Sequence, residues 1–495
     1  MPLVAVAATV VGAYAATRIW FASDLPYFVD EGTYAVFSDR AAHSVDQLFV
    51  SLTIGPRVFQ TWLGIPLIRL GLDPLTAMRL ISVLAGFATV AVVALIARRM
   101  AGTAAAVVAA TLCVALPLLL VHDAIGIIEP LLTLLMAAAL YLEIELARRP
   151  DLRIAVVLGL VVACGVLTKE TAWAAVALMP VSLLCFDWSP DGRSRRLRKW
   201  LQGAAIAVAG AVAAELAMRS SDYYATLEHL RGTPLYTVRS VGDVLSDPFG
   251  SLGKTWDVFG PAFNGYVTLP LLAAALVGAA IGLRRQPRLT AVLLAWFAVP
   301  LTASLLFSTA AYPRHLLPLM PPLLVLVAYA LVEVAAWART VLPPRAAVPA
   351  IAAGVLLLLA PAFRLDARVL AHPDTAKYPG RDDWQYVTGA PAGSQWPAVA
   401  EAIRRFAGSG RVIVISPTAD PSIARLLLGD DARYVFVSGD SPLAPQARLA
   451  LTEEKPYILD VKAVAVMQKG HPRVIERFQR PRGGDVIELS ELGPG

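Results

Sequence analysis

The sequence predicts a polytopic α-helical membrane protein of about eleven transmembrane helices that ends in a small α/β domain outside the membrane. Only 16% of the 495 residues are charged, whereas soluble domains carry about 25%. Apolar runs of the ~20 residues that cross hydrocarbon recur before residue 363. Charged residues return after it. We therefore expect a membrane domain at residues 1–363 and a water-soluble domain at residues 364–495.

Hydrophobicity along the chain locates the individual spans. The eleven predicted spans are 3–22, 77–97, 101–121, 125–146, 153–168, 170–186, 200–218, 266–283, 289–308, 315–338 and 347–363. Residues 53–72 are amphipathic and interrupted by proline, which predicts a helix along the membrane surface. The first apolar segment has no basic region before it, so we expect an uncleaved helix rather than a signal peptide.

Basic residues mark every second loop between the spans. They are Arg98 and Arg99, Arg148, Arg149 and Arg153, the cluster 193–199, Arg284, Arg285 and Arg288, and Arg339 and Arg345. The positive-inside rule makes these loops cytoplasmic. The N-terminus is then cytoplasmic, and loops 23–76 and 219–265 and the tail lie outside. The net charge of +6 is explained by these loops, so no nucleic-acid partner is expected.

The tail alternates between helix-like and strand-like segments. Residues 396–410 are typical of a helix, and residues 411–416, 433–438 and 457–461 are rich in β-forming residues. This alternation predicts a small α/β domain. The three cysteines all lie in apolar segments before the tail, and they predict neither a disulfide framework nor a metal site.

Acidic residues stand out in the first two outer loops. Asp30 and Glu31 follow the first span. His122 and Asp123 lie in the short loop between the third and fourth spans, and Glu129 lies near the start of the fourth span. An ionisable residue inside an apolar segment is a functional candidate. The plain alternatives are that the acid pair only begins a helix, near its positive dipole end, and that Asp123 caps one.

Cations stand out in two further outer turns. Lys169 and Glu170 occupy one, and Arg314 and His315 follow a proline in the other. The plain alternatives are a lysine that snorkels to water and an interfacial arginine beside a proline turn. Together with the acids, these residues place carboxylates and cations at helix ends on one side of the membrane. This arrangement suits a reaction in which a carboxylate takes a proton and cations hold a phosphate leaving group.

At these residues the chain resembles the C-type integral membrane glycosyltransferases, particularly glycosyltransferase family 39. That family includes protein O-mannosyltransferases and bacterial lipid A aminoarabinose transferases. The resemblance covers most of residues 1–340. It rests on 29-VDEGTY-34, on Asp123, on Lys169–Glu170, and on 312-YPRHLLPLMPP-322, which is similar to the family's R-Y/H-L-L-P-x-x-P stretch.

The resemblance implies a role for each candidate residue. Asp30 would act as, or orient, the base toward the acceptor, with Glu31 beside it and Asp123 as the second-loop acid. The candidate residues for the donor phosphate are Lys169, Arg314 and Arg57. Those expected to line the substrate are His122, Tyr312, His315 and Glu170. Some relatives bind a divalent metal, for which His122, Asp123 and Glu31 are the candidate ligands, but no cofactor is required and no ligand spacing here is diagnostic.

The resemblance implies transfer of a sugar from a polyprenyl-phosphate donor to a hydroxyl of a glycan, lipid or protein, with inversion, at the outer face of a bacterial plasma membrane. No nucleotide-sugar motif is expected or found. One alternative is another lipid-linked transferase, such as a glycan ligase or polymerase. A second is a transporter or flippase of lipid-linked sugars, although such proteins usually place polar residues near the membrane midplane. A third is a non-catalytic assembly or receptor protein. The sequence names neither the sugar nor the acceptor.

Overall fold

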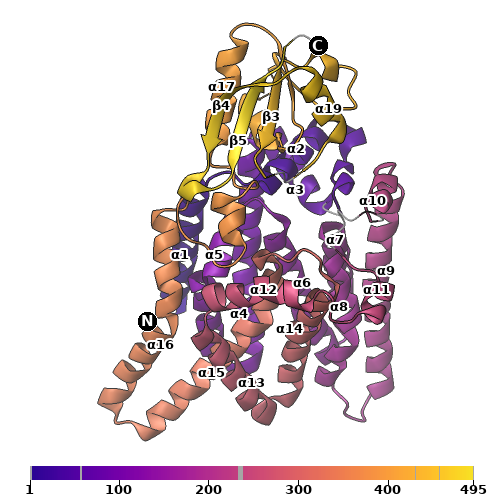
Figure 1. The fold of residues 1–495 in the computed structure, drawn as a ribbon. Coiled ribbons are helices and arrows are strands. Elements are labelled where there is room, and N and C mark those ends of the chain that lie inside the picture. Colours follow the sequence, from indigo (N-terminus) through magenta and orange to yellow (C-terminus); the bar gives the residue numbers. More distant parts are fainter. Residues whose placement is uncertain are drawn as a thin grey trace.

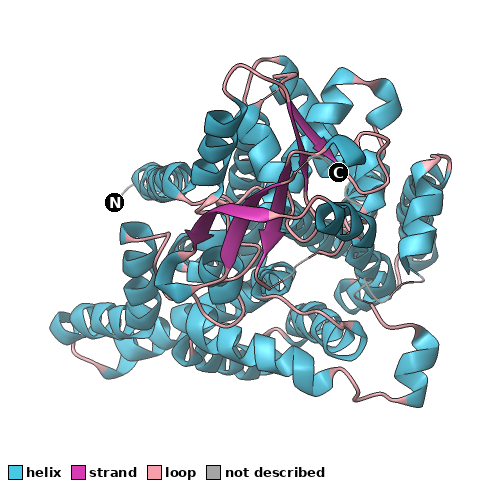
Figure 2. Cartoon of the chain, turned by 45° about the horizontal axis from the view of Figure 1, so that its top comes forward, coloured by secondary structure: helices cyan, strands magenta, loops and turns pink. Residues whose placement is uncertain are grey.

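The computed structural model describes residues 3–55, 58–231, 233, 238–429, 431–455 and 458–493. Its helices and strands form two layers (Figure 1). Long helices run side by side through the lower layer, and a β-sheet with its own helices caps them at one end. Figure 2, tilted toward the cap, shows the strands lying over the helical body. The predicted fold class, a polytopic helical membrane protein with a small strand-containing C-terminal part, is confirmed.

Apolar helices form the membrane layer. They are α1 (Leu3–Asp24), α4 (Pro74–Ala115), α6 (Ile128–Arg148), α7 (Leu152–Thr168), α9 (Arg193–Arg219), α13 (Leu269–Arg285), α14 (Pro287–Phe307), α15 (Met320–Val341) and α16 (Pro344–Ala371). In the described residues, seven helices are long and apolar enough to cross a membrane, or eight if one bent pair is a single span. The remaining predicted spans fall on the second arm of α4, on α7, on residues 170–185 and on α13, which are shorter. The exact number of spans therefore stays a prediction.

Helix α4 contains a sharp break that accounts for two predicted spans. Ala101 and Gly102 leave helical geometry there, and Gly102 has a φ of 73°, which glycine adopts without steric cost. Both arms contact neighbouring turns of α1: the Tyr14 hydroxyl donates to the Val83 carbonyl at 3.0 Å, and Arg18 donates to the Val114 carbonyl at 2.8 Å. The chain therefore reverses direction at the break.

Shorter elements connect the long helices. They are α2 (Val29–His43), α3 (Val58–Arg69), α5 (Pro117–Asp123), α8 (Trp173–Leu178), α10 (Tyr223–Arg231), α11 (Val241–Ser246), α12 (Leu252–Ala262), the 3₁₀ turns η1 (Val45–Gln47), η2 (Val50–Thr53), η3 (Glu170–Ala172), η4 (Met179–Cys185) and η6 (Pro313–Leu319), and the π-helix η5 (Phe263–Val267). The predicted surface helix at 53–72 corresponds to α3. The segment from α12 through η5 bends by 89° into α13.

A five-stranded mixed sheet forms the centre of the cap. Its strands are β1 (Val412–Ile415), β2 (Tyr434–Val437), β3 (Leu449–Glu453), β4 (Arg473–Gln479) and β5 (Val486–Glu491), in the spatial order β2-β1-β3-β5-β4. Strand β1 runs parallel to β2 and β3, whereas β5 is antiparallel to β3 and β4. The cap also contains η7 (Trp384–Thr388, a π-helix), α17 (Trp396–Ala407), α18 (Ser422–Leu428), η8 (Ala444–Gln446), α19 (Val461–Lys469) and η9 (Pro481–Gly483).

One predicted strand of the cap is wrong. Residues 458–460 belong to no strand, α19 begins at Val461, and residue 457 lies outside the described residues. The reason is local: Asp460 accepts a hydrogen bond from the Ala463 amide at 2.9 Å and so begins a helix. The predicted strands at 411–416 and 433–438 correspond to β1 and β2, and the predicted helix at 396–410 to α17.

The cap is joined to α2, the helix that follows α1. The Val29 amide donates to the Pro391 carbonyl at 3.1 Å, and Phe28 forms a bridge with Ala392. Val29 itself is buried in the hydrophobic cluster of the cap. One face of α2 is thus part of the cap, while α16 continues without interruption across the predicted domain boundary at residue 363 to Ala371.

A buried ion pair inside the cap holds the segment that meets α2. Arg480 binds both carboxylate oxygens of Glu453, at 2.7 and 2.8 Å, and donates to the carbonyls of Ala390 and Ala392 at 2.9 Å. On the same cap-facing side of α2, one helical turn after Val29, the Thr33 hydroxyl lies 3.1 Å from Asp420 Oδ2. Burial raises the pKa of Asp420, although hydrogen bonds from Ser422 and Thr33 oppose that rise.

Glu31 fixes the other face of α2 to the membrane helices. Arg79 of α4 donates to its two carboxylate oxygens at 3.0 and 2.6 Å, and the amides of Phe28 and Gly126 donate at 3.0 and 2.9 Å. Arg79 also donates to the carbonyl of Ala22, in the last turn of α1, and to that of Pro26, in the connection between α1 and α2. The Glu31 side chain is fully buried, so this ion pair sets the position of α2.

We predict that Glu31→Gln destabilises the protein. All four partners of the carboxylate are hydrogen-bond donors, so an amide NH₂ group would face donors and Arg79 would lose its charge partner. Breaking one side of a buried pair typically costs about 3–5 kcal/mol, which thermal unfolding followed by tryptophan fluorescence should detect. Glu401→Gln is the matched control, because its partner Arg405 is 58% exposed. Equal melting temperatures for the two variants would contradict the assigned role.

We also predict that the cap lies on the side of the membrane away from the cytoplasm. In a chain without its native cysteines, Cys113, Cys164 and Cys185, a cysteine introduced at the exposed Ser409 should react with a membrane-impermeant thiol reagent in intact cells, after any outer membrane is made permeable. A cysteine at Ser194, in the predicted cytoplasmic loop, should react only once the inner membrane is opened. The reverse pattern would overturn the topology.

Candidate functional site

The two adjacent acids at the start of α2, Asp30 and Glu31, point to different surroundings. Glu31 is occupied by Arg79, as described above. Asp30, the preceding residue on α2, instead accepts a hydrogen bond from Arg314 Nη2 at 2.7 Å. Adjacent residues on a helix are separated by about 100°, which explains why only one of the pair faces this partner. The geometry favours a positioning role for Glu31, and Asp30 is the acid of the pair that faces Arg314.

Arg314 is buried at the centre of the site. It lies in η6, and its guanidinium carbon is 5.3 Å from the Phe28 ring centroid and 4.7 Å from the Tyr312 ring centroid. Its side chain is only 7% exposed. Within the described residues, Nε and Nη1 have no hydrogen-bond acceptor. A guanidinium offers five donors in a planar fork, so Arg314 keeps unused donors in a buried position.

A second carboxylate completes the charge cluster. Glu129, in the first turn of α6, lies 3.0 Å from Lys169 Nζ, 3.6 Å from Arg314 Nε and 4.0 Å from His315 Nε2. Lys169 caps the end of α7. We define the charge cluster as Asp30, Glu129, Lys169, Arg314 and His315. Four chain segments therefore bring two carboxylates and two permanent cations, with a histidine, to the cap end of the membrane helices.

The cap adds a third cation next to the cluster. The guanidinium of Arg381 is 4.7 Å from the ring centroid of Tyr312 and 5.3 Å from that of Trp384. The guanidinium groups of Arg314 and Arg381 therefore both contact the ring of Tyr312. The ring of His315 makes an edge contact with Tyr312, and the two ring centroids are 5.6 Å apart. Sequence reasoning had not selected Arg381, because its segment has the mixed polar and aromatic composition of an ordinary surface loop.

His122 connects the second loop to the same segment of the cap. Its Nδ1 lies 2.7 Å from the Leu118 carbonyl, which can only accept, so Nδ1 carries the proton. Its Nε2 lies 3.1 Å from Asp382 Oδ2, and the Tyr266 hydroxyl donates to the same oxygen at 2.7 Å. His122 and Asp382 are both fully buried. Asp382 is a second residue that the sequence did not identify.

Asp123 lies apart from the charge cluster. Its Oδ2 accepts from the Tyr14 hydroxyl at 3.1 Å. Both side chains pack over Gly86 of α4, where a Cβ atom would lie 2.4 Å from Asp123 Cγ and 2.3 Å from the Tyr14 oxygen. The guanidinium carbon of Arg18 also lies 4.8 Å from the Tyr14 ring centroid. This arrangement makes Asp123 a contact between α1, α4 and α5.

The other candidate residues from the sequence also lie outside the charge cluster or have other partners. Glu170 accepts a hydrogen bond from Arg231 Nε of α10 at 3.1 Å and so faces the segment that follows α9. Arg57 lies outside the described residues. The proposed metal ligands are divided among different partners: Glu31 among Arg79 and two amides, Asp123 with Tyr14, and His122 with Asp382. Across the part of the chain that the structure describes, no group of three or more His, Cys, Asp or Glu side chains could hold a metal ion, and these three residues do not fit one.

Comparison with known proteins agrees with the predicted resemblance. Residues 59–216 match the family model described as dolichyl-phosphate-mannose-protein mannosyltransferase. No curated protein matches the chain. Among solved structures, ArnT from Cupriavidus metallidurans in the apo state has 17% identity and a TM-score of 0.60, with 98% of this chain and 97% of that chain covered. The same protein bound to undecaprenyl phosphate has 18% identity, a TM-score of 0.59 and the same coverage.

A second group of structures has the same fold. The archaeal oligosaccharyltransferase AglB from Archaeoglobus fulgidus, in complex with an inhibitory peptide and a dolichol-phosphate, has 13% identity and a TM-score of 0.54, with 91% of this chain and 69% of that chain covered. Likeness at such identities shows the fold. The resemblance predicted from the sequence is confirmed: this chain is a polytopic membrane protein with the fold of the C-type membrane glycosyltransferases.

Proposed function

We propose that this protein transfers a sugar from a polyprenyl-phosphate donor to an acceptor hydroxyl, and that the charge cluster is the site of transfer. The observation that carries the proposal is the buried Arg314, which donates to Asp30 through one nitrogen and has two other nitrogens with no acceptor among the described residues. Such an arginine is suited to a phosphate, which it can bind through parallel charge-assisted hydrogen bonds. The family match and the bound lipid phosphates of ArnT and AglB support the same class of donor.

Arg314 and Lys169 are the residues that hold the donor phosphate in this proposal. Each is paired with a carboxylate, Arg314 with Asp30 and Lys169 with Glu129. A phosphate that enters between them competes with those carboxylates for the same donors. The cations then face the oxygen on which charge develops as the sugar leaves, which is the condition for electrostatic stabilisation of a transition state.

Asp30 is the proposed general base. Once the phosphate engages Arg314, the Asp30 carboxylate is available to the acceptor hydroxyl. The acceptor oxygen forms a bond to the anomeric carbon, the bond from that carbon to the phosphate oxygen breaks, and Asp30 takes the hydroxyl proton. The electron pair of the broken bond leaves on the lipid phosphate. A single displacement of this kind inverts the anomeric configuration.

The location of the cluster supports this proposal over a transporter. The polar residues lie at the cap end of the membrane helices, where Glu129 occupies the first turn of α6 and Lys169 the end of α7. Secondary transporters place their substrate site near the membrane midplane, on broken helices. We propose the outer face of a bacterial plasma membrane as the place of the reaction, with the cap outside, where it meets the acceptor.

We predict that Asp30→Asn reduces transfer by at least about 100-fold, because general-base catalysis typically supplies 10²–10⁴-fold. Asparagine keeps the size of the side chain and still accepts a hydrogen bond from Arg314, but it takes no proton near neutral pH. Transfer of labelled sugar from a polyprenyl phosphate should be measured in reconstituted vesicles, and retention of the lipid donor by native mass spectrometry.

Asp39→Asn is the matched control for this variant. Asp39 lies on the same helix, and its carboxylate is 3.4 Å from the exposed His43. The Asp39→Asn variant should therefore transfer sugar at a rate close to that of the wild type. If Asp30→Asn keeps more than about a third of wild-type turnover, Asp30 is not the base. If the wild type transfers no sugar from any polyprenyl-phosphate donor, the enzyme assignment itself fails.

A further inference from the structure

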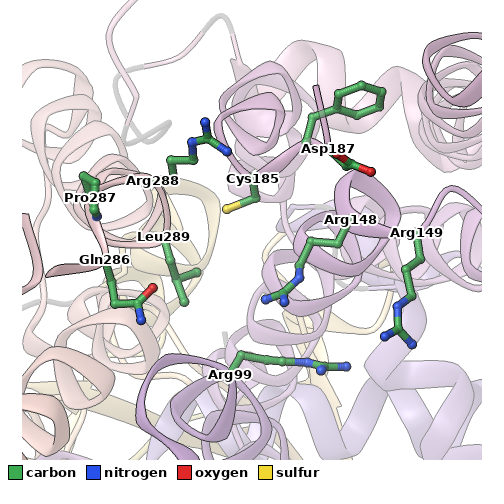
Figure 3. Close-up of a pocket in the computed structure, with 10 residues that line it drawn as sticks. Arg99, Arg148, Arg149, Cys185, Asp187, Gln286, Pro287, Arg288 and Leu289 are labelled. Atoms are coloured by element: carbon green, nitrogen blue, oxygen red, sulfur yellow. The ribbon is translucent and has the colours of Figure 1, made fainter. Parts of the chain in front are cut away.

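A second polar site lies at the other end of the membrane helices. It is a pocket of about 550 Å³ that includes Arg99, Arg148, Arg149 and Arg288 (Figure 3). Arg148 is in the last turn of α6, the helix that begins beside Glu129. At 1.5 Å per residue, the 21 residues of α6 separate the pocket from the charge cluster by about 30 Å. The two sites are therefore at opposite membrane surfaces.

The arginines converge from loops that are far apart in the sequence. Arg99 precedes the break in α4, Arg148 and Arg149 end α6, and Arg288 is in the first turn of α14. Figure 3 shows Arg148 and Arg288 on either side of Cys185, with Arg99 near Arg148.

The positive charge of the pocket is only partly balanced. Arg99 pairs with Glu145 at 2.8 Å, and the single acid of the lining, Asp187, lies 3.6 Å from Arg196 outside it. Among the described residues, Arg148, Arg149 and Arg288 form no ion pair. Like charges that line one pocket repel one another. A bound anion would offset that repulsion and connect the start of α14 to the end of α6.

The rest of the lining indicates what kind of anion fits. Phe186, Cys185 and Leu289 give the pocket an apolar side, and the first turn of α14 adds the positive end of a helix dipole. Guanidinium groups bind phosphate through paired hydrogen bonds. A site that joins several arginines to apolar surface, at the ends of membrane helices, matches a lipid phosphate better than a free ion.

We propose that this pocket binds the phosphate headgroup of an anionic phospholipid in the leaflet opposite the cap. The arginines hold the phosphate, and the apolar side faces the glycerol and the first acyl carbons. Basic pockets between membrane helices recognise anionic headgroups through the same chemistry. The assignment is independent of the transfer reaction, because none of its residues belongs to the charge cluster.

The test compares two double variants of the full chain in nanodiscs that contain phosphatidylglycerol and phosphatidylcholine. Arg148→Ala with Arg288→Ala removes two arginines of the pocket. Arg195→Ala with Arg198→Ala removes two exposed arginines of the predicted loop on the same face. Native mass spectrometry after extraction should show retained phosphatidylglycerol on the wild type and the second variant, and at least tenfold less on the first.

Cys185 provides a readout that leaves the arginines unchanged. In a chain that lacks Cys113 and Cys164, phosphatidylglycerol should slow alkylation of Cys185 at least threefold, and phosphatidylcholine should not. Equal lipid loss in both double variants would show diffuse surface charge and overturn the proposal. Protection of Cys185 by millimolar inorganic phosphate, to the same degree as by the lipid, would show a free-anion site and overturn the lipid assignment.

Discussion

The ion pair between Asp30 and Arg314 is the contact on which the proposed site depends. It joins α2 to η6, which are 284 residues apart in the chain, in a position where both side chains are largely buried. Isolated charges are costly to bury, so each group requires the other. The pair therefore keeps a carboxylate next to the cation proposed to bind the donor phosphate. It also leaves two Arg314 nitrogens without an acceptor in the described residues.

The cap helps to hold this pair in place. The Arg480–Glu453 pair secures Ala390 and Ala392, and that segment pairs with Phe28 and Val29 immediately before Asp30. From the opposite side, Glu31 and Arg79 fix the same helix to α4. Helix α2 is thus bound on two faces, and Asp30 lies between them. A module that appeared in the sequence only as a tail is structurally part of the site.

The sequence predicted the membrane fold and several residues of the site because charges are rare in its apolar segments. Asp30, Lys169 and Arg314 stand out for that reason, and the structure brings them to one end of the helices. The different surroundings of Asp30 and Glu31 were not predictable, since they depend on where Arg79 and Arg314 arrive in space. Arg381 and Asp382 were missed because nothing local distinguishes their loop from a solvated one. The strand predicted at 457–461 was wrong because Asp460 begins a helix.

The central claim is that the donor phosphate takes Arg314 away from Asp30. A cryo-electron microscopy structure of the protein in nanodiscs, with and without a polyprenyl phosphate, measures this directly. With the lipid, we expect a phosphate oxygen within hydrogen-bond distance of Arg314 and Lys169, and an Arg314 Nη2 to Asp30 Oδ2 distance longer than 2.7 Å. A phosphate bound elsewhere, with that ion pair unchanged, would contradict the central claim.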